Sequence, residues 1–497
     1  MTASSVALVG TAVFALAATV AQIAPDTYLD LLSGRFVADH WLPHLDSLTL
    51  AGAGRRWIDQ QWLADLLYYA SWRVGGYALV VLLATLAMAG GFAVLTLLMA
   101  SGGVQPQRAA LFSMAAVFMV LETQVQAQSF SYLFYPMLLW VLCVDSRVDR
   151  FSPRLGALLL PLLVVWSNLH GVALLGAGIA FAYALVRSAR AAARSDRRSS
   201  LGYLFTALAC PAALLATPYG LETIRYYRSV LGDHELTSVG GWRPLGVSQP
   251  LFWIFVVVAV VTVACVTFGL RHARPPNLVL LGTAALVGVL TTQSGRYLIW
   301  FVMAAIPLAA EAVSSPTGSR TRAPEPRRLA VLLAAALVLL LGVLGLRVVA
   351  LVRASNASYE AESAPRAVLA ATTRFLGCDP EATVLADQES ADALLWLDPH
   401  SAGRVAYDGR LEIYPAAALA GWVDFIHGMD VRAALGRSDY ELAVASSANG
   451  KLALALRNVR GWRILLADKA GIAVVRVDSN APSCRHEGLG AAGRPGR

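Results

Sequence analysis

The residues best suited to chemistry lie in a polar stretch between residues 25 and 76. It opens with PDTYLDLLSGR at residues 25–35, where Asp26 and Asp30 are four positions apart. A helix would place both carboxylates on one face. At a membrane surface, such a carboxylate can take the proton of an acceptor hydroxyl that attacks a lipid-linked sugar, or help to hold a divalent cation against the departing phosphate. The alternative is that Asp26 only caps an interfacial helix.

The rest of this stretch supplies aromatic and polar groups. Asp46 lies in LPHLDS at residues 42–47, which predicts a turn. WIDQQWLADLLYY at residues 57–69 has the pattern of an amphipathic helix in the headgroup zone, because it is rich in Trp and Tyr. Four residues of this part of the chain are candidates for contacting an acceptor: Asp46, Trp57, Gln61 and Trp62.

The amino-acid composition indicates what kind of protein positions these groups. Hydrophobic residues make up 57% of the 497 residues and charged residues only 14%, against about 25% charged residues in soluble proteins. This excludes a soluble globule and a disordered chain, and five cysteines are too few for a disulfide scaffold. The sequence therefore predicts a polytopic α-helical membrane protein.

Apolar runs predict about eleven transmembrane helices, each of roughly 20 residues or somewhat fewer. The run 155–186 is too long for one span and is interrupted by WSNLHG at residues 166–171, so we predict two short helices that meet at a polar tip. The other runs lie at residues 5–24, 77–100, 109–121, 132–144, 201–216, 250–270, 276–293, 297–310 and 329–346.

The distribution of charge predicts the orientation. The net charge of +8 divides into +9 for residues 1–352 (24 Arg against 15 acids) and −1 for residues 353–497 (16 basic against 17 acidic residues). The excess lies in the membrane half, so it indicates topology and no nucleic-acid partner. Arginines gather in alternate loops, which places the N-terminus in the cytoplasm. Residues 25–76 and everything after 352 would then be extracytoplasmic.

Three parts of the chain follow from this topology. We predict a transmembrane domain over residues 1–352, with 25–76 as its first extracytoplasmic loop carrying amphipathic helices. Alternating helical and extended patterns predict an extracytoplasmic α/β domain over residues 353–479. We expect a disordered tail at 480–497. Within the α/β domain, the helical stretches are 364–376, 391–397 and 452–459, and the extended ones are 383–387, 404–408, 440–446, 463–467 and 472–477.

Other ionisable residues have two interpretations each. His170 could bind phosphate or metal, or close the turn between two helices by hydrogen bonds. Arg296 could clamp a lipid phosphate or contact phospholipid headgroups, and Arg225 and Arg228 have the same alternatives. In the sequence after residue 353, Asp408 and Arg410 flank a glycine, which is typical of a turn; they could also line an acceptor groove. No nucleotide-binding glycine motif occurs.

Several motifs together resemble a bacterial group of polytopic membrane proteins classed with the GT-C glycosyltransferases, most of them without an assigned reaction. The resemblance covers residues 25–477 and depends on the loop motifs given above. It depends also on residues 128–133 (QSFSYL), 166–171 (WSNLHG), 217–220 (TPYG), 294–297 (SGRY) and 405–414 (VAYDGRLEIY). The chain departs from the group at Asp30, where His is common, at Gln61, and at residues 393–395.

The resemblance implies a multi-pass glycosyltransferase of the bacterial cytoplasmic membrane, with a GT-C-like fold. It would transfer a hexose or pentose from a polyprenyl-phosphate donor to a glycan, lipid or protein acceptor, with Asp26 as the base. We expect Asp30 beside it, Arg296, His170, Arg225 and Arg228 at the donor phosphate, and Mg²⁺ or Mn²⁺ as a cation held by Asp26 and His170. The alternatives are a non-catalytic scaffold for envelope assembly and a lipid or solute transporter.

Overall fold

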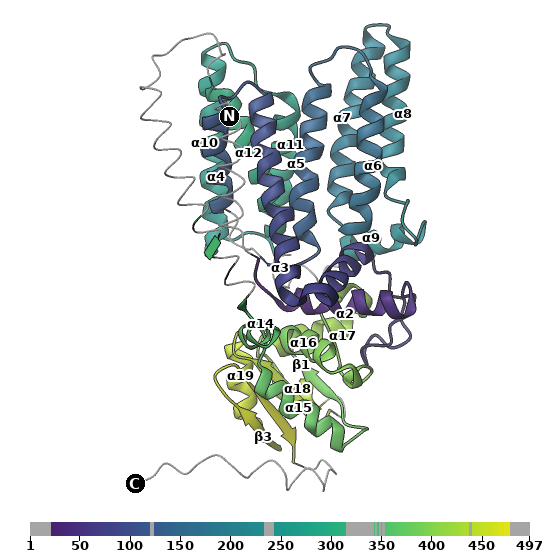
Figure 1. Cartoon of the computed structure of the whole chain (residues 1–497), viewed down its shortest axis with the longest axis vertical. Helices are drawn as coiled ribbons and strands as arrows, with labels where there is room; N and C mark the ends of the chain where they lie inside the picture. Colours follow the sequence, from purple (N-terminus) through teal and green to yellow (C-terminus); the bar gives the residue numbers. More distant parts are fainter. Residues whose placement is uncertain are drawn as a thin grey trace. The chain divides into compact units, whose positions relative to one another are not determined.

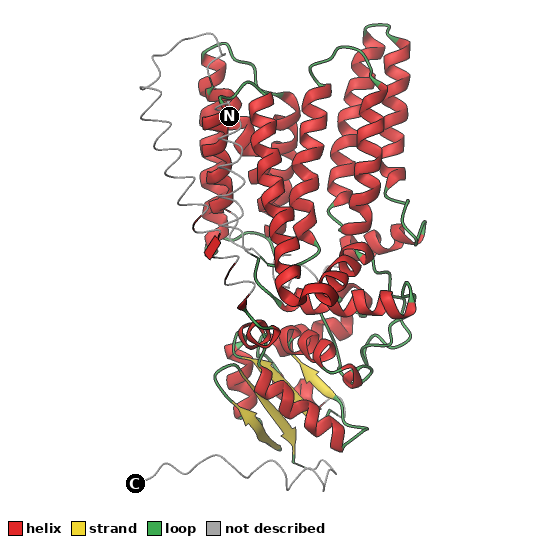
Figure 2. Cartoon of the chain, viewed as in Figure 1, coloured by secondary structure: helices red, strands yellow, loops and turns green. Residues whose placement is uncertain are grey.

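The computed structural model describes residues 21–119, 124–232, 243–314, 342, 345–346, 349, 353–436 and 440–477. Within these ranges the chain is mostly helical and has one small sheet in its C-terminal part (Figure 2). The chain divides into two compact units. Unit 1 comprises residues 1–22 and 59–355, and unit 2 comprises residues 23–58 and 356–497.

Unit 1 is a bundle of apolar helices (Figure 1). Four described stretches are long and apolar enough to cross a membrane: α3 (Trp62–Ser101), α7 (Ala173–Ala193), α10 (Pro250–Arg271), and Gly295–Val313, which combines the 3₁₀ turn η3 (Gly295–Tyr297) with α12 (Leu298–Val313). The shorter helices are α4 (Pro106–Met119), α5 (Gln128–Asp145), α6 (Pro153–Leu169), α8 (Arg197–Ala213), α9 (Glu222–Gly232) and α11 (Leu278–Gln293).

The predicted multi-pass α-helical membrane fold is confirmed. Nine of the eleven predicted spans fall on described helices of unit 1. The other two, residues 5–24 and 329–346, lie mostly outside the described residues, and the tail at 480–497 lies wholly outside them. The predicted interruption at 166–171 is confirmed as well, because α6 ends at Leu169 and α7 begins at Ala173.

The helix predicted over residues 57–69 is different in the structure. It begins only at Trp62, five residues later than predicted, and it is separated from the rest of α3 by a break in the helix. The backbone leaves helical geometry at Gly75 and Gly76, and Gly76 has φ +61° and ψ −160°, a conformation that glycine tolerates and other residues do not. The two glycines therefore divide α3 into two helical segments, 62–74 and 77–101.

A close approach of α3 and α5 depends on Gly91. A Cβ at Gly91 would come within 2.0 Å of the carbonyl oxygen of Tyr132, whereas a Cβ at the adjacent Gly90 would meet only the side chain of Leu133 at 3.4 Å. We expect Gly91→Ala to force the helices apart and to cost about 1–3 kcal/mol of stability. Gly90→Ala should be neutral or stabilising, because alanine favours the helix. Thermal unfolding of both variants checks this, and equal melting temperatures would contradict it.

Unit 2 is built on a four-stranded sheet of β1 (Val384–Ala386), β2 (Leu442–Ser446), β3 (Trp462–Ala467) and β4 (Gly471–Arg476), in the order β1-β2-β4-β3. β1 and β2 are parallel, and the other two pairs are antiparallel. α15 (Arg366–Cys378), α16 (Gln388–Leu397) and α19 (Gly450–Arg457) pack on this sheet, and α2 (Pro25–His40) packs on α16 (Figure 1). The remaining helices are α14 (Asn356–Ser363), α17 (Ala416–Ile426) and α18 (Val431–Gly436).

The predicted α/β character of this part of the chain is confirmed, but two details need correction. Residues 404–408 do not form a strand; Val405 makes only isolated bridges to Thr49 and Val384. The chain instead turns away at Asp408, whose side chain is buried. The first loop is also divided between the units, because residues 23–58 pack with the C-terminal segment. Accordingly α2 is not a surface amphipathic helix: Thr27 to Gly34 are all buried.

Candidate functional site

Asp26 and Asp30 lie on the first turns of α2, as the spacing predicts. Asp26 is not the cap of this helix. The N-cap is Ala24, and the Thr27 hydroxyl accepts a hydrogen bond from the Ala24 amide at 3.0 Å. The capping alternative for Asp26 is therefore wrong. Asp30 is buried, with 2% of its surface exposed, while Asp26 is only half-buried.

A glutamine that the sequence analysis missed orients Asp26. The side-chain amide of Gln388 donates a hydrogen bond to Asp26 Oδ1 at 3.0 Å. Gln388 is held in turn by the residue before it, because Asp387 caps α16 through the amide of Ser390 and also accepts from the amide of Ser446 on β2. The end of β1 thus fixes the start of α16, and the start of α16 fixes Asp26.

A second missed residue, Asp392, lies one turn further along α16. It is fully buried, and its Oδ1 accepts a hydrogen bond from the amide of Gly409 at 2.9 Å. Burial, and then the nearby charge of Asp408, raise the pKa of Asp392 well above its ordinary value, and Asp26 contributes in the same direction. Gln388 and Asp392 are four residues apart at the end of a strand, and this spacing was the signal that could have revealed them.

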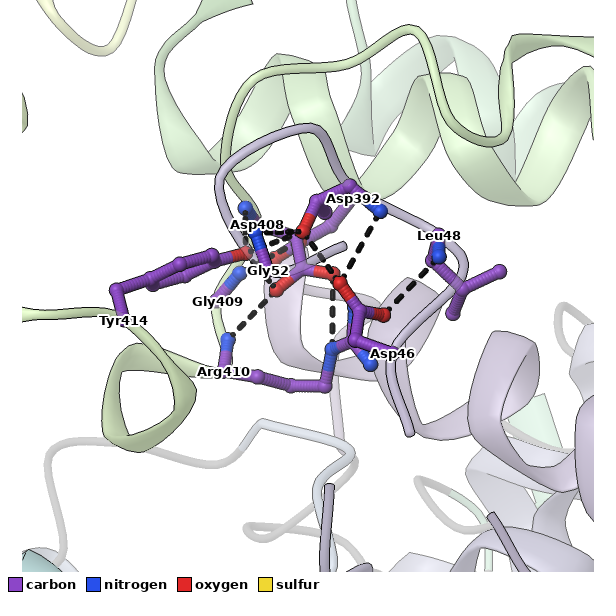
Figure 3. Close-up of polar contacts among 9 residues, drawn as sticks. Asp46, Leu48, Gly52, Asp392, Asp408, Gly409, Arg410 and Tyr414 are labelled. Atoms are coloured by element: carbon purple, nitrogen blue, oxygen red, sulfur yellow. Dashed lines mark hydrogen bonds and ion pairs between the residues drawn. The ribbon is translucent and has the colours of Figure 1, made fainter. Parts of the chain in front are cut away.

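Arg410 lies at the centre of a buried network (Figure 3). Its Nη2 contacts Asp46 Oδ1 at 2.8 Å and Asp408 Oδ2 at 2.5 Å, and its Nε donates to Asp408 Oδ2 at 2.9 Å. The guanidinium also lies over the ring of Trp57, with its carbon 4.2 Å from the ring centroid. The Tyr414 hydroxyl donates to Asp408 Oδ1 at 2.8 Å. All three charged groups are at least 95% buried.

This network brings together four of the six residues that the sequence suggested for acceptor contacts: Asp46, Trp57, Asp408 and Arg410. The carboxylates of Asp46 and Asp408 are engaged with Arg410, and Asp46 also accepts from the amides of Leu48 and Thr49. The observed contacts tie the first loop to the segment 408–414. A role of these residues toward an acceptor stays a prediction.

We expect Arg410→Ala to destabilise unit 2 strongly. Its removal leaves two carboxylates buried without their cation, and breaking a buried pair in this way costs about 3–5 kcal/mol. Arg432→Ala, on the exposed side of α18, is the matched control and should leave the stability unchanged. Thermal and denaturant unfolding of the full chain measure both. If Arg410→Ala unfolded at the same midpoint as the wild type, the network would not stabilise unit 2.

We expect Asp392→Asn to reduce the pH dependence of stability. Because the folded state raises the pKa of Asp392 above its ordinary value of 3.8, the unfolded chain releases this proton first. Stability should therefore fall as the pH rises above about 4, until the folded carboxyl itself ionises. Between about pH 5 and about pH 8, the melting temperature should fall more for the wild type than for Asp392→Asn. The exposed control Asp424→Asn should behave as the wild type; a parallel pH profile for Asp392→Asn would refute the argument.

In unit 1, the polar tip between α6 and α7 forms a second cluster. Trp166 Nε1 donates to Ser131 Oγ at 2.8 Å, and Ser131 Oγ lies 3.0 Å from His170 Nδ1. Because Ser131 accepts from Trp166, its own proton is available for Nδ1, which also accepts from the amide of Val172. We infer that the imidazole carries its proton on Nε2. These contacts fit the alternative in which His170 closes the turn between the two helices. Its Nε2–H is still available as a donor.

Residues 60–62 support the same tip. The Trp62 indole donates to Asn168 Oδ1 at 2.8 Å, and the Gln60 amide donates to the carbonyl of Ser167 at 2.5 Å. Asn168 itself donates to the carbonyls of Val164 and Ala216. Trp62, one of the predicted acceptor residues, therefore helps to position this turn. Gln61, another of them, is the N-cap of α3.

The predicted phosphate-binding residues of unit 1 differ in exposure and in charge. Burial, and then the charge of Arg296, lower the pKa of His170 to about 3, so its imidazole is neutral at physiological pH. Arg296 lies on η3 and is exposed. Arg225 and Arg228 are exposed on α9, where Ile224 is exposed too. That mixture fits the headgroup-anchoring alternative for α9.

A divalent cation was expected at Asp26 and His170. These residues belong to different units. Among the residues that the structure describes, no group of three or more His, Cys, Asp or Glu side chains is arranged to hold a metal ion. The cation therefore stays a prediction, and no step proposed below depends on it.

The sequence matches no protein-family model and no curated protein. Its fold, however, is similar to solved structures. The apo oligosaccharyltransferase of Archaeoglobus fulgidus matches with a TM-score of 0.53 and 11% identity, over 92% of this chain and 71% of that chain. The same protein tethered to an acceptor peptide containing the NVT sequon matches with a TM-score of 0.55 and 11% identity, over 95% and 74%.

ArnT from Cupriavidus metallidurans bound to undecaprenyl phosphate matches with a TM-score of 0.50 and 13% identity, over 96% of this chain and 97% of that chain. These neighbours are GT-C membrane glycosyltransferases. The chain therefore has the GT-C fold, as the motifs predicted.

Proposed function

We propose that this protein is a membrane glycosyltransferase that transfers a hexose or pentose from a polyprenyl-phosphate donor to an extracytoplasmic glycan, lipid or protein acceptor. The GT-C fold supports the general kind of enzyme. The neighbour ArnT binds undecaprenyl phosphate, and the neighbouring oligosaccharyltransferase was captured with an acceptor peptide. Both properties belong to those proteins, and they motivate the same classes of donor and acceptor here.

One observation carries the assignment of the base. Of the six aspartate carboxylates of unit 2 that surround the start of α16 and Arg410, namely Asp26, Asp30, Asp46, Asp387, Asp392 and Asp408, only Asp26 is not buried. Gln388 fixes its orientation through Oδ1. A half-exposed and oriented carboxylate can accept the proton of an acceptor hydroxyl, whereas buried carboxylates serve to hold the frame around it.

The reaction that fits these groups is a single displacement. The acceptor oxygen forms a bond to the anomeric carbon, its proton passes to Asp26, and the bond from that carbon to the phosphate oxygen breaks. Polyprenyl phosphate leaves with the electron pair. Arg296 would compensate the charge of the leaving phosphate, and Nε2–H of the neutral His170 would donate a hydrogen bond to it.

We propose the orientation from the charge pattern. The arginine-rich connections after α5 and α7 include Arg147, Arg150, Arg194 and Arg197, and the positive-inside rule assigns them to the cytoplasm. The tip at 166–171 has neither Arg nor Lys and would face the outside. Unit 2 would then be extracytoplasmic, where lipid-linked sugars and envelope acceptors are available.

We expect Asp26→Asn to abolish transfer. Purified full chain would be incubated with a panel of polyprenyl-phosphate sugars and membrane glycans, with and without Mg²⁺ or Mn²⁺, and free polyprenyl phosphate would be measured. Loss of a general base lowers the rate by roughly 10²–10⁴-fold. Asp39→Asn is the matched control, because Asp39 is exposed at the other end of α2, and it should retain the wild-type rate.

Two results would contradict this proposal in different ways. Wild-type release that survives in Asp26→Asn would keep the enzyme class and reject Asp26 as the base. No release from any donor with any acceptor would reject the enzyme class and favour the scaffold or transporter alternatives.

A further inference from the structure

A cavity of about 620 Å³ lies in unit 1, between α7 and α11. One wall is a stripe of α7 that runs from Ile179 to Arg190, and the facing wall is a stripe of α11 from Leu278 to Leu286. The residues after the end of α5 and Glu311 near the end of α12 complete it. The volume falls in the range of small-molecule sites. The cavity is separate from the His170 tip, which precedes the first residue of α7.

One arginine of this cavity is part of a buried network. Arg187 Nη2 donates to the Tyr203 hydroxyl at 2.6 Å, and its Nε lies 4.0 Å from Asp145 Oδ2. Tyr183 and Tyr203 donate to the same Asp145 oxygen at 2.6 and 3.0 Å. Arg187 and Asp145 therefore balance each other, and they hold α5, α7 and α8 in place around the cavity.

Two other arginines of the cavity remain available to a ligand. Arg147 and Arg190 are exposed, and the side chain of neither makes a hydrogen bond or ion pair with any residue that the structure describes. The carboxyl group of Glu311 accepts a hydrogen bond from Asn277 Nδ2 at 3.2 Å. Asn277 also caps α11 through the amides of Val279 and Leu280, so the positive end of that helix faces the same region. The cavity thus offers an excess of positive charge.

Much of the cavity wall is apolar and exposed. Val186, Leu278 and Leu286 line it and are 44–58% exposed. A free anion would gain nothing from such walls, whereas the acyl chains of a lipid would cover them. Basic pockets between transmembrane helices are a known mode of binding anionic lipid headgroups.

We propose that this cavity binds an anionic glycerophospholipid, with its phosphate between Arg147 and Arg190 and an acyl chain between α7 and α11. The lipid would join the two helices, which form opposite walls of the cavity. With the orientation proposed above, it would come from the cytoplasmic leaflet. The site is independent of the proposed transfer reaction.

Native mass spectrometry of the detergent-purified full chain tests this. Dioleoyl-phosphatidylglycerol is titrated and compared with dioleoyl-phosphatidylcholine, and inorganic phosphate is added as a competitor in a separate arm. We expect preferential binding of phosphatidylglycerol that resists phosphate. The double variant Arg147→Gln/Arg190→Gln should bind it roughly 30-fold more weakly. Arg108→Gln/Arg271→Gln, which removes two exposed arginines outside the cavity, should bind normally.

A second pair of variants tests the acyl-chain part without changing charge. A Cβ at Gly282, which lines the cavity, meets no atom within 4 Å, and the same holds for Gly178, which lies on α7 outside it. Gly282→Leu should fill the cavity and abolish the preference for phosphatidylglycerol, and Gly178→Leu should not. Equal binding by all variants would overturn the proposal. If inorganic phosphate displaced the lipid and the Gly282→Leu variant still bound it, the site would be one for a free anion and the proposal would be overturned.

Discussion

The buried guanidinium of Arg410 is the contact on which unit 2 depends. It lies between Asp46 of the first loop and Asp408 of the C-terminal segment, 364 residues from Asp46 in sequence. Because a buried charge without its partner is costly, the loop and the segment cannot separate without exposing or stranding all three charges. The same contact holds Gly409, whose amide donates to Asp392. The Arg410 contacts therefore help to position α16, which carries both Asp392 and the Gln388 that orients Asp26.

Burial divides the carboxylates of unit 2 into two groups with different tasks. Asp46 and Asp408 are ionic partners of Arg410, and burial favours the protonated form of Asp392. Asp26 is half-buried, and the side-chain amide of Gln388 donates a hydrogen bond to its Oδ1. Low dielectric surroundings penalise a buried charge and spare one that reaches solvent. This contrast makes Asp26 the group best suited to exchange a proton with a substrate.

Unit 1 follows a different constraint, because polar groups inside a membrane must find partners within the protein. At the tip between α6 and α7, Trp166, Ser131 and His170 form a chain of hydrogen bonds. Toward the other end of α7, Asp145, Tyr183, Tyr203 and Arg187 satisfy one another. Donors outside these networks are the groups that we propose for phosphate binding: Nε2–H of His170 at the tip, and the guanidinium groups of Arg147 and Arg190 at the cavity.

The sequence alone determined what depends on local pattern: the membrane helices, the break before Ala173, most of the C-terminal strands and helices, and the placement of Asp26 and Asp30 on one helix. Hydropathy and spacing carry that information because each helix or strand needs its own apolar face. Only the tertiary structure decided that residues 23–58 pack with the C-terminal segment, that Gln388 and Asp392 accompany Asp26, and that Arg410 is buried. Those contacts join residues hundreds of positions apart, and their energies come from burial and charge pairing that no local pattern records.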